Sequence, residues 1–242
     1  MISVCIPTYN GEKYIRHQLD SILSQMGVDD EVVISDDSST DRTIEIIKEF
    51  RDSRIILIEG CSFRSPVLNL ENTLKFAKGD YIFLADQDDV WLPGKVGITL
   101  ERLLEYDVVV CNGFVVDQDE KVIQPSYFDW KGSRPGFFIH LAKNAYLGHS
   151  MAFNRKVLNS VLPFPRHIVM QDLWIGLIGK YVGWVYFIPK SLFCYRSLSE
   201  NYSAAISKGD RELSDFGFWN KMELMFLVGK RVLFDKSRID II

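Results

Sequence analysis

The stretch that decides the fold is Gly79 to Asp89, which reads GDYIFLADQDD. Its apolar part, Asp80 to Ala85, is typical of a short buried strand, and three carboxylates (Asp86, Asp88 and Asp89) follow at once. Carboxylates this close raise one another's pKa unless a cation neutralises them, and a hard divalent ion accepts oxygen ligands of this kind. A surface acidic turn is the alternative interpretation, but the position directly after a strand favours a ligand site.

Similar apolar runs lie on both sides of this stretch and alternate with segments of helical periodicity. Strands are predicted at Ile2–Ile6, Glu31–Ser35, Arg54–Ile58 and Val108–Cys111, and helices over Glu12–Met26 and Asn69–Lys78. Strands that alternate with helices in this way predict an α/β fold, in which helices flank a mostly parallel central sheet.

Polar residues gather at the carboxyl ends of three of these strands. The clusters are Pro7–Glu12, Asp36–Asp41 and Asp86–Asp89. Ligands of parallel sheets bind beyond the carboxyl ends of the strands, so the three loops are expected to share one site. Taken alone, Asp36–Asp41 is better explained by helix capping, because Ser, Thr and acidic residues stabilise a helix N-terminus.

The second half of the chain has a looser pattern. We predict a hairpin over Val115–Ile123, a loop over Gln124–Gly136, strands at His149–Asn154, Val185–Ile188 and Leu192–Tyr195, and helices over Gln171–Tyr181 and Asp210–Phe234. This favours one domain over residues 1–205, made of a regular half (1–112) and a looser half (113–205) and followed by a helical tail (206–242).

Composition excludes several classes of protein. The 242 residues carry a formal net charge of −4, which argues against a nucleic-acid partner held by bulk charge. The four cysteines form no C-x-x-C pair, so we expect free thiols in a reducing compartment. Neither a signal peptide nor a run of about 18 apolar residues is present, which indicates a cytoplasmic protein. The chain lacks the glycine-rich motifs of P-loop enzymes and dinucleotide-binding folds.

Other candidate residues are ambiguous when they are considered singly. Asp172 precedes an amphipathic segment in a position to face a cleft, but taken by itself it is better explained as a helix-start residue. The four histidines (His17, His140, His149 and His167) have no metal-ligand spacing, which favours structural or surface roles for each of them.

Taken together, the motifs resemble glycosyltransferase family 2. The resemblance rests on Ile6–Gly11 (IPTYNG), Ser35–Asp41 (SDDSSTD) and Gly79–Pro93 (GDYIFLADQDDVWLP). Gly148–Arg155, Gln171–Trp174 and Cys194–Arg196 follow in the family's order. The DQDDVW form is most similar to the bacterial rhamnosyltransferase-like branch. The resemblance implies a GT-A fold, the nucleotide-diphospho-sugar transferase type, with a nucleotide-sugar-binding half over residues 1–112 and an acceptor and catalytic half over residues 113–205.

The resemblance also implies a role for each matching residue. Pro7, Tyr9, Asn10 and Glu12 would line the nucleotide pocket, Asp36 or Asp37 would bind the base, Asn69 would belong to the donor site, Asp86 and Asp88 would form the D-x-D pair, Asp172 would be the general base, and Arg196 would help to hold the diphosphate. Of the D-x-D pair, Asp88 is expected to lie closest to a Mg²⁺ or Mn²⁺ ion.

The implied activity is an inverting, metal-dependent transfer of a sugar from a dTDP-, UDP- or GDP-linked donor to a saccharide. The acceptor would be a precursor of a bacterial capsule, O-antigen or exopolysaccharide, free or lipid-linked. Such a reaction needs a carboxylate to accept the proton of the attacking hydroxyl and a cation to stabilise the leaving diphosphate.

The sequence leaves one alternative function open and argues against another. The chain departs from the family pattern at Gln171, where Glu or His is usual, at Ser197, where His is common, and at Asn112, where Asp is frequent. These departures keep a non-catalytic nucleotide-sugar-binding homologue as the alternative. A nucleotidyltransferase would need a glycine-rich basic loop after the first strand, which Pro7–Gly11 does not provide.

The C-terminal segment carries a hypothesis of its own. Aromatic residues mingle there with lysines and arginines, which is compatible with peripheral contact at the inner face of the plasma membrane. Packing of this segment on the domain is the simpler interpretation.

Overall fold

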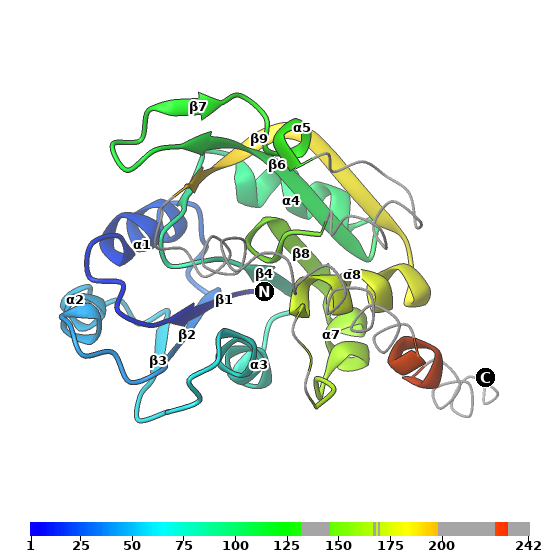
Figure 1. Cartoon of the computed structure of the whole chain (residues 1–242), viewed down its shortest axis with the longest axis horizontal. Coiled ribbons are helices and arrows are strands. Elements are labelled where there is room, and N and C mark those ends of the chain that lie inside the picture. The colour runs from blue at the N-terminus through cyan, green and yellow to red at the C-terminus, as the bar shows by residue number, and fades with distance from the viewer. Residues whose placement is uncertain (132–145, 167, 169, 198–225, 232–242) are drawn as a thin grey trace, which may run out of the picture.

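A computed structural model describes residues 1–131, 146–166, 168, 170–197 and 226–231. Strands and helices alternate in chain order through the first half of the chain (Figure 1). The elements are β1 (Ile2–Thr8), α1 (Ile15–Leu23), β2 (Glu31–Asp36), α2 (Thr43–Glu49), β3 (Ile55–Ile58), α3 (Pro66–Phe76), β4 (Tyr81–Leu84), β5 (Val90–Trp91), α4 (Lys95–Leu103), β6 (Val108–Val116), β7 (Val122–Gln124), α5 (Tyr127–Lys131), the 3₁₀ turn η1 (Gly148–Ser150), β8 (Met151–Asn154), α7 (Arg155–Val161), α8 (Gln171–Val182) and β9 (Val185–Arg196).

One sheet runs through the described part of the chain in the order β3-β2-β1-β4-β8-β6-β9-β5, and β7 pairs with β6. The strands β3, β2, β1 and β4 are parallel, whereas β8 is antiparallel to both of its neighbours. The predicted α/β architecture is confirmed. Because β1 and β2 pair in register up to Thr8 and Asp36, the loops that follow them leave the sheet at the same edge.

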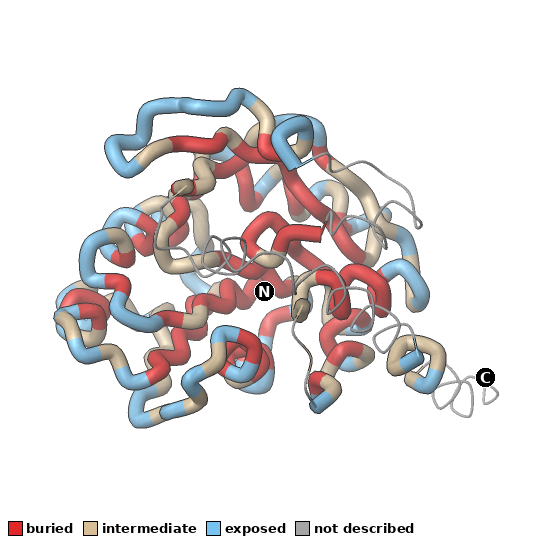
Figure 2. The backbone as a smooth tube through the Cα atoms, in the orientation of Figure 1, coloured by how far each residue is buried: buried red, intermediate tan, exposed pale blue. Residues whose placement is uncertain are grey.

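Two hydrophobic clusters cover the two faces of the sheet, and Figure 2 shows the buried strands between their helices. Along β1, Cys5 belongs to one cluster while Val4 and Ile6 belong to the other, because successive side chains of a strand point to opposite faces. Helices α3, α7 and α8 cover the first face, and α1, α2 and α4 cover the second. Because these strands are buried on both faces, most of their residues are apolar, which explains the continuous apolar runs in the sequence.

The second half departs from the prediction in three places. The strand predicted at His149–Asn154 begins only at Met151, because Gly148–Ser150 form the 3₁₀ turn η1. Residues predicted as a loop over Gln124–Gly136 include the last residue of β7 and the helix α5. The two short strands predicted at Val185–Ile188 and Leu192–Tyr195 form the single strand β9, whose register against β6 shifts after Ile188. Pro189 lies at this shift, where it has no N–H group to donate to the ladder, and Pro189, Lys190 and Ser191 interrupt the apolar run in the sequence.

Most of the C-terminal segment lies outside the described residues, as does the domain boundary predicted near residue 205. Residues 226–231 are helical, and the Arg231 guanidinium donates to the carbonyl oxygens of Ser160 and Leu162 at the end of α7. No helix in the described ranges is long and apolar enough to cross a membrane. All four cysteines are free thiols, as predicted, and Cys5 and Cys111 are buried.

Candidate active site

The loops after β1 and β4 are joined by a pair of hydrogen bonds. The Tyr9 N–H donates to Gln87 Oε1 at 3.0 Å, and Gln87 Nε2 donates back to the Tyr9 carbonyl at 3.0 Å. Gly11 makes this approach possible, since a Cβ atom there would lie 2.7 Å from Gln87 Cδ. Gln87 is the unassigned second residue of the predicted D-x-D motif, and the structure gives it the task of joining the two loops.

The loops after β1 and β2 are joined in the same manner. The Asn10 N–H donates to Ser39 Oγ at 2.9 Å, and Asn10 Oδ1 accepts from the Thr40 N–H at 2.8 Å. The Glu12 N–H donates to Asp41 Oδ2 at 3.0 Å. The three polar loops therefore form one continuous rim, as predicted from their positions after parallel strands.

Asp36 and Asp37 are both buried beneath this rim. Asp36 accepts hydrogen bonds from Thr8 Oγ1 at 2.9 Å and from the Ser39 N–H at 2.8 Å. Asp37 accepts from the backbone N–H groups of residues 63–65, which belong to the loop before α3. Each carboxylate thus organises a loop of the site, and its contact with a nucleotide base stays a prediction.

Asn69 and Tyr9 both lie at this edge of the sheet, but Asn69 is buried and Tyr9 is exposed. Asn69 on α3 is buried and donates from Nδ2 to the Thr8 carbonyl at 3.1 Å, while its Oδ1 has no hydrogen-bond partner among the described residues. Tyr9 is 56% exposed, so its ring is available to a ligand at the sheet edge. Pro7 pairs with Ser35 inside the sheet and is only partly buried.

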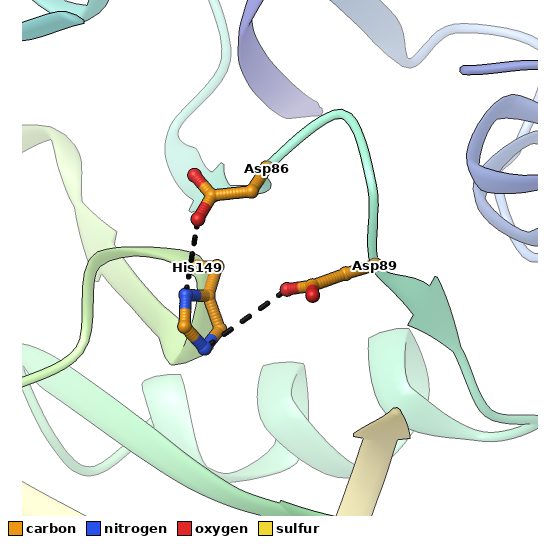
Figure 3. A group of neighbouring side chains, drawn as sticks. All are labelled: Asp86, Asp89 and His149. Carbon is orange, nitrogen blue, oxygen red and sulfur yellow. Dashed lines mark hydrogen bonds and ion pairs between the residues drawn. The ribbon is translucent and has the colours of Figure 1, made fainter. Parts of the chain in front are cut away.

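Three side chains from two distant segments converge beyond β4 (Figure 3). Asp86 Oδ2 lies 3.2 Å from His149 Nδ1, and His149 Nε2 lies 3.9 Å from Asp89 Oδ2. One ligand atom from each residue lies within 4.8 Å of the other two, which is a separation that a single metal ion can bridge. Two carboxylates and an imidazole suit a divalent first-row metal such as Mn²⁺. Asp88, predicted to lie closest to the ion, adjoins this group but is not one of its three members.

Burial and like charge raise the pKa values of two carboxyl groups in the acidic turn. Burial and the charge of Asp86 raise the pKa of Asp89 to about 6, against the opposing influence of His149 and Lys95. Burial and the neighbouring carboxylates Asp89 and Asp86 raise the pKa of Asp88 to about 8. Asp89 Oδ2 and His149 Nε2 are both buried without a hydrogen-bond partner among the described residues. Both atoms can act as metal ligands, and a bound cation would satisfy them.

A buried lysine and an aromatic wall fix His149 in place. Lys95 Nζ donates to the His149 carbonyl at 3.2 Å and lies 4.3 Å from the Trp91 ring centre and 4.8 Å from that of Phe193. The imidazole stacks on Tyr195 at 5.2 Å between ring centres. Burial disfavours the protonated imidazole, but the charges of Asp89 and Asp86 outweigh it and raise the pKa of His149.

Asp172 lies in the first turn of α8, close to the loop that carries His149. Its carboxylate accepts the N–H of Leu173 at 2.8 Å, and a Cβ atom built on Gly148 would lie 3.9 Å from Asp172 Cβ. Burial raises the pKa of the Tyr127 hydroxyl, and the nearby charges of Asp89 and Asp172 raise it further. The predicted general base therefore faces the same region as the Asp86–Asp89–His149 group.

Arg196, the last residue of β9, reaches the same loop from the other side. It is 4% exposed, and its Nε donates to the Asp88 carbonyl at 3.1 Å. Its backbone N–H donates to Asp89 Oδ1 at 3.4 Å. The structure therefore brings Arg196 to the Asp88–Asp89 turn, and its contact with a diphosphate stays a prediction.

The sequence offered no signal that joins His149 and Lys95 to the acidic loop. His149 lies in a 3₁₀ turn 60 residues after Asp89, and Lys95 could have been taken for an exposed residue at a helix start. Only the pairing of β8 beside β4 brings the two segments together.

Solved structures of low sequence identity share the fold. The chain superimposes on S. aureus TarS 1–349 in complex with UDP-GlcNAc with a TM-score of 0.72 and 21% identity, over 96% of this chain and 66% of that one. It superimposes on the mannosyltransferase PcManGT from Pyrobaculum calidifontis, in complex with GDP-Man and Mn²⁺, with a TM-score of 0.64 and 19% identity, over 98% of this chain and 73% of that one. These likenesses identify the predicted GT-A fold.

Sequence comparison gives the family. A curated relative, the Escherichia coli UDP-Glc:α-D-GlcNAc-diphosphoundecaprenol β-1,3-glucosyltransferase WfgD, is 32% identical over 185 residues, which are 74% of this chain and 70% of WfgD. The dTDP-rhamnosyl transferase RfbG of Shigella flexneri is 37% identical over 110 residues, which cover 40% of this chain and 36% of RfbG. The family model described as glycosyl transferase family 2 matches residues 3–162. This chain belongs to glycosyl transferase family 2.

Proposed function

We propose that the chain is an inverting, cation-dependent glycosyltransferase that moves a sugar from a nucleotide-diphosphate donor to a hydroxyl of a lipid-linked saccharide, a precursor of a bacterial surface glycan. The observation that carries the proposal is the Asp86–Asp89–His149 group, which lies at the carboxyl edge of the parallel strands and beside Asp172. Carboxylates whose pKa is raised in such a position mark a functional site.

The donor would lie along the rim formed by the three polar loops. The exposed Tyr9 ring offers a surface for stacking of the base, with Pro7, Asn10 and Glu12 in the same loop. Beneath it, Asp36, Asp37 and the unpartnered Asn69 Oδ1 offer acceptors for the N–H and hydroxyl groups of a nucleoside. TarS in complex with UDP-GlcNAc and PcManGT in complex with GDP-Man support a nucleotide-sugar donor.

A Mn²⁺ or Mg²⁺ ion held by Asp86, Asp89 and His149, with Asp88 adjoining, would neutralise the charge that develops on the leaving diphosphate. The partnerless Asp89 Oδ2 and His149 Nε2 fit this occupant, as does the like charge concentrated in the turn. The structural neighbour PcManGT is in complex with Mn²⁺ together with GDP-Man, which supports the same choice.

Asp172 would accept the proton of the attacking hydroxyl. Its carboxylate is partly exposed and lies on the His149 side of the group, so an acceptor could enter between the two. A single displacement at the anomeric carbon, with Asp172 as the base, inverts the configuration of the transferred sugar. Positioning of the two substrates would supply a large share of the rate.

The relatives support a lipid-linked acceptor. The names of WfgD and of a second E. coli glucosyltransferase, WfaP, specify α-D-GlcNAc-diphosphoundecaprenol; WfaP is 40% identical over 96 residues, which are 40% of this chain and 38% of WfaP. The donor sugars named among the relatives include both glucose and rhamnose, so a test of the activity needs hexosyl and rhamnosyl donors.

The experiment is a transfer assay with UDP-glucose, dTDP-rhamnose and GDP-mannose, each with Mn²⁺ and a short-chain analogue of GlcNAc-diphospholipid. We expect one donor to give a disaccharide product of inverted anomeric configuration, which mass spectrometry and NMR will identify. Asp172→Asn should abolish the product while nucleotide binding is retained. Transfer by Asp172→Asn at the wild-type rate would contradict the assigned base, and nucleotide binding without any transfer would favour the non-catalytic homologue.

A further inference from the structure

The guanidinium group of Arg196 is bonded to the protein itself. An arginine that presents its charge to a ligand would leave part of this group unbonded. Nε donates to the Asp88 carbonyl at 3.1 Å, Nη1 to the Gln118 carbonyl at 3.0 Å, and Nη2 to Glu120 Oε1 at 2.9 Å. The guanidinium carbon also lies 4.9 Å from the ring centre of Tyr14. The planar fork of the side chain is thus directed at two different segments of the chain, the acidic turn and the β6–β7 hairpin.

Glu120 is the counter-ion that compensates the buried guanidinium. It lies at the tip of the hairpin between β6 and β7, which projects at the top of Figure 1. Its Oε1 also lies 2.9 Å from Nδ1 of His17 on α1. Arg196 and, to a smaller degree, His17 lower the pKa of Glu120, so the carboxylate stays ionised at neutral pH.

We propose that Arg196 is a positioning residue that holds the Asp88–Asp89 turn in its cation-binding conformation, and that Glu120 holds Arg196 in place. This proposal rests on the proposed cation site. It replaces direct contact with the diphosphate, since the guanidinium is buried, charge-compensated and bonded on all three of its nitrogens. The backbone N–H of Arg196 reaches Asp89 Oδ1, so the same residue orients a candidate metal ligand.

The two roles predict different results when Mn²⁺ is bound without any nucleotide. A residue that contacts only the diphosphate has no influence on the affinity for Mn²⁺ alone. A residue that orients the acidic turn changes this affinity, and groups that orient metal ligands typically contribute roughly 10- to 100-fold. Loss of the counter-ion separates the roles further, because an arginine freed from Glu120 would bind a diphosphate more tightly, not less.

The experiment measures Mn²⁺ binding to the full chain by electron paramagnetic resonance of the free ion, followed by calorimetry of nucleotide binding in saturating Mn²⁺. The variants are Arg196→Lys, which keeps the charge but loses the fork, and Glu120→Gln, which removes the counter-ion. Asp119→Asn is the matched control, since it removes an equal charge from the neighbouring position, where no partner of the Asp119 side chain is found among the described residues.

We expect Arg196→Lys to weaken Mn²⁺ binding about tenfold or more, Glu120→Gln to weaken it several-fold, and Asp119→Asn to leave it within about twofold of wild type. Equal Mn²⁺ affinity in all four proteins would overturn the proposal, as would tighter nucleotide binding by Glu120→Gln. Failure of the wild type to bind Mn²⁺ would instead refute the proposed cation site. Because Glu120 lies on an exposed hairpin, Glu120→Gln is expected to fold, and a thermal melt checks this.

Discussion

In the absence of a cation, Asp89→Asn should be more stable than wild type by a margin that grows as the pH rises. Asp89 is 2% exposed, and its pKa is raised from an ordinary value of 3.8 to about 6. Between these two values the folded chain binds more protons than the unfolded chain, so the free energy of unfolding falls as the pH increases. An asparagine at this position carries no charge and avoids that loss.

The size of the effect follows from the shift in pKa. A rise of about two units corresponds to roughly 3 kcal/mol at most, of which about half is lost between pH 5 and pH 7.5. The advantage of Asp89→Asn over wild type should therefore grow by about 1–2 kcal/mol across this interval, which is roughly 2–8 °C in Tm for a chain of this size.

Mn²⁺ should stabilise wild type but have little effect on Asp89→Asn. A ligand that binds only the folded state at 100 times its Kd stabilises it by about 2.7 kcal/mol. Wild type should gain stability of this order at pH 7.5 and less at pH 5, because the carboxylates must lose protons to bind the ion. Asp89→Asn should gain little at either pH.

The assay is thermal unfolding followed by circular dichroism at pH 5 and 7.5, in EDTA and in Mn²⁺, with Asp119→Asn as the surface control. Two results would refute the reasoning. One is a Tm difference between Asp89→Asn and wild type that is the same at both pH values in EDTA. The other is an equal Mn²⁺ shift in the two proteins.

Three further substitutions test other parts of the site. Asp172→Asn should lower kcat by about 10²- to 10⁴-fold while the Kd for the donor nucleotide is unchanged, and a parallel loss of binding in calorimetry would contradict a role confined to proton transfer. Tyr9→Ala should weaken nucleotide binding roughly tenfold or more through lost stacking, and an unchanged Kd would show that the base binds elsewhere. Gly11→Ala should push the Gln87 side chain aside and so lower both Tm and nucleotide affinity. Gly97→Ala is the control, because the space around its Cβ position is open, and it should change neither quantity. Equal behaviour of the two alanine variants would argue against the pairing of the loops through Gln87.

The first half of the fold could be predicted because its signals are local. Each strand from β1 to β4 is a continuous apolar run that ends in polar residues, and parallel pairing alone then brings the polar loops together. The acidic turn after β4 was found in the same way. Its three carboxylates are adjacent in sequence, so no tertiary contact was needed to recognise them.

The second half could not be predicted to the same depth, because its site residues meet only through tertiary contacts. His149 joins the acidic turn because β8 inserts beside β4 in antiparallel orientation, which no hydropathy pattern specifies. In the sequence, the proline in β9 looks like the end of a strand. The helix α5 has only five residues, which are too few for a helical period to be recognised. The contacts of Arg196 with the β6–β7 hairpin depend on the same long-range pairing.

The most direct test of the cation-dependent donor site is calorimetric titration of the protein with UDP, GDP and dTDP, each with and without Mn²⁺, in wild type and His149→Ala. The proposed site predicts that one nucleotide binds, that binding tightens at least tenfold with Mn²⁺, and that His149→Ala loses this dependence while keeping the weak metal-free binding. A nucleotide affinity that changes neither with Mn²⁺ nor with His149→Ala would contradict a cation-dependent donor site at Asp86, Asp89 and His149. The absence of binding by any of the three nucleotides would contradict it as well.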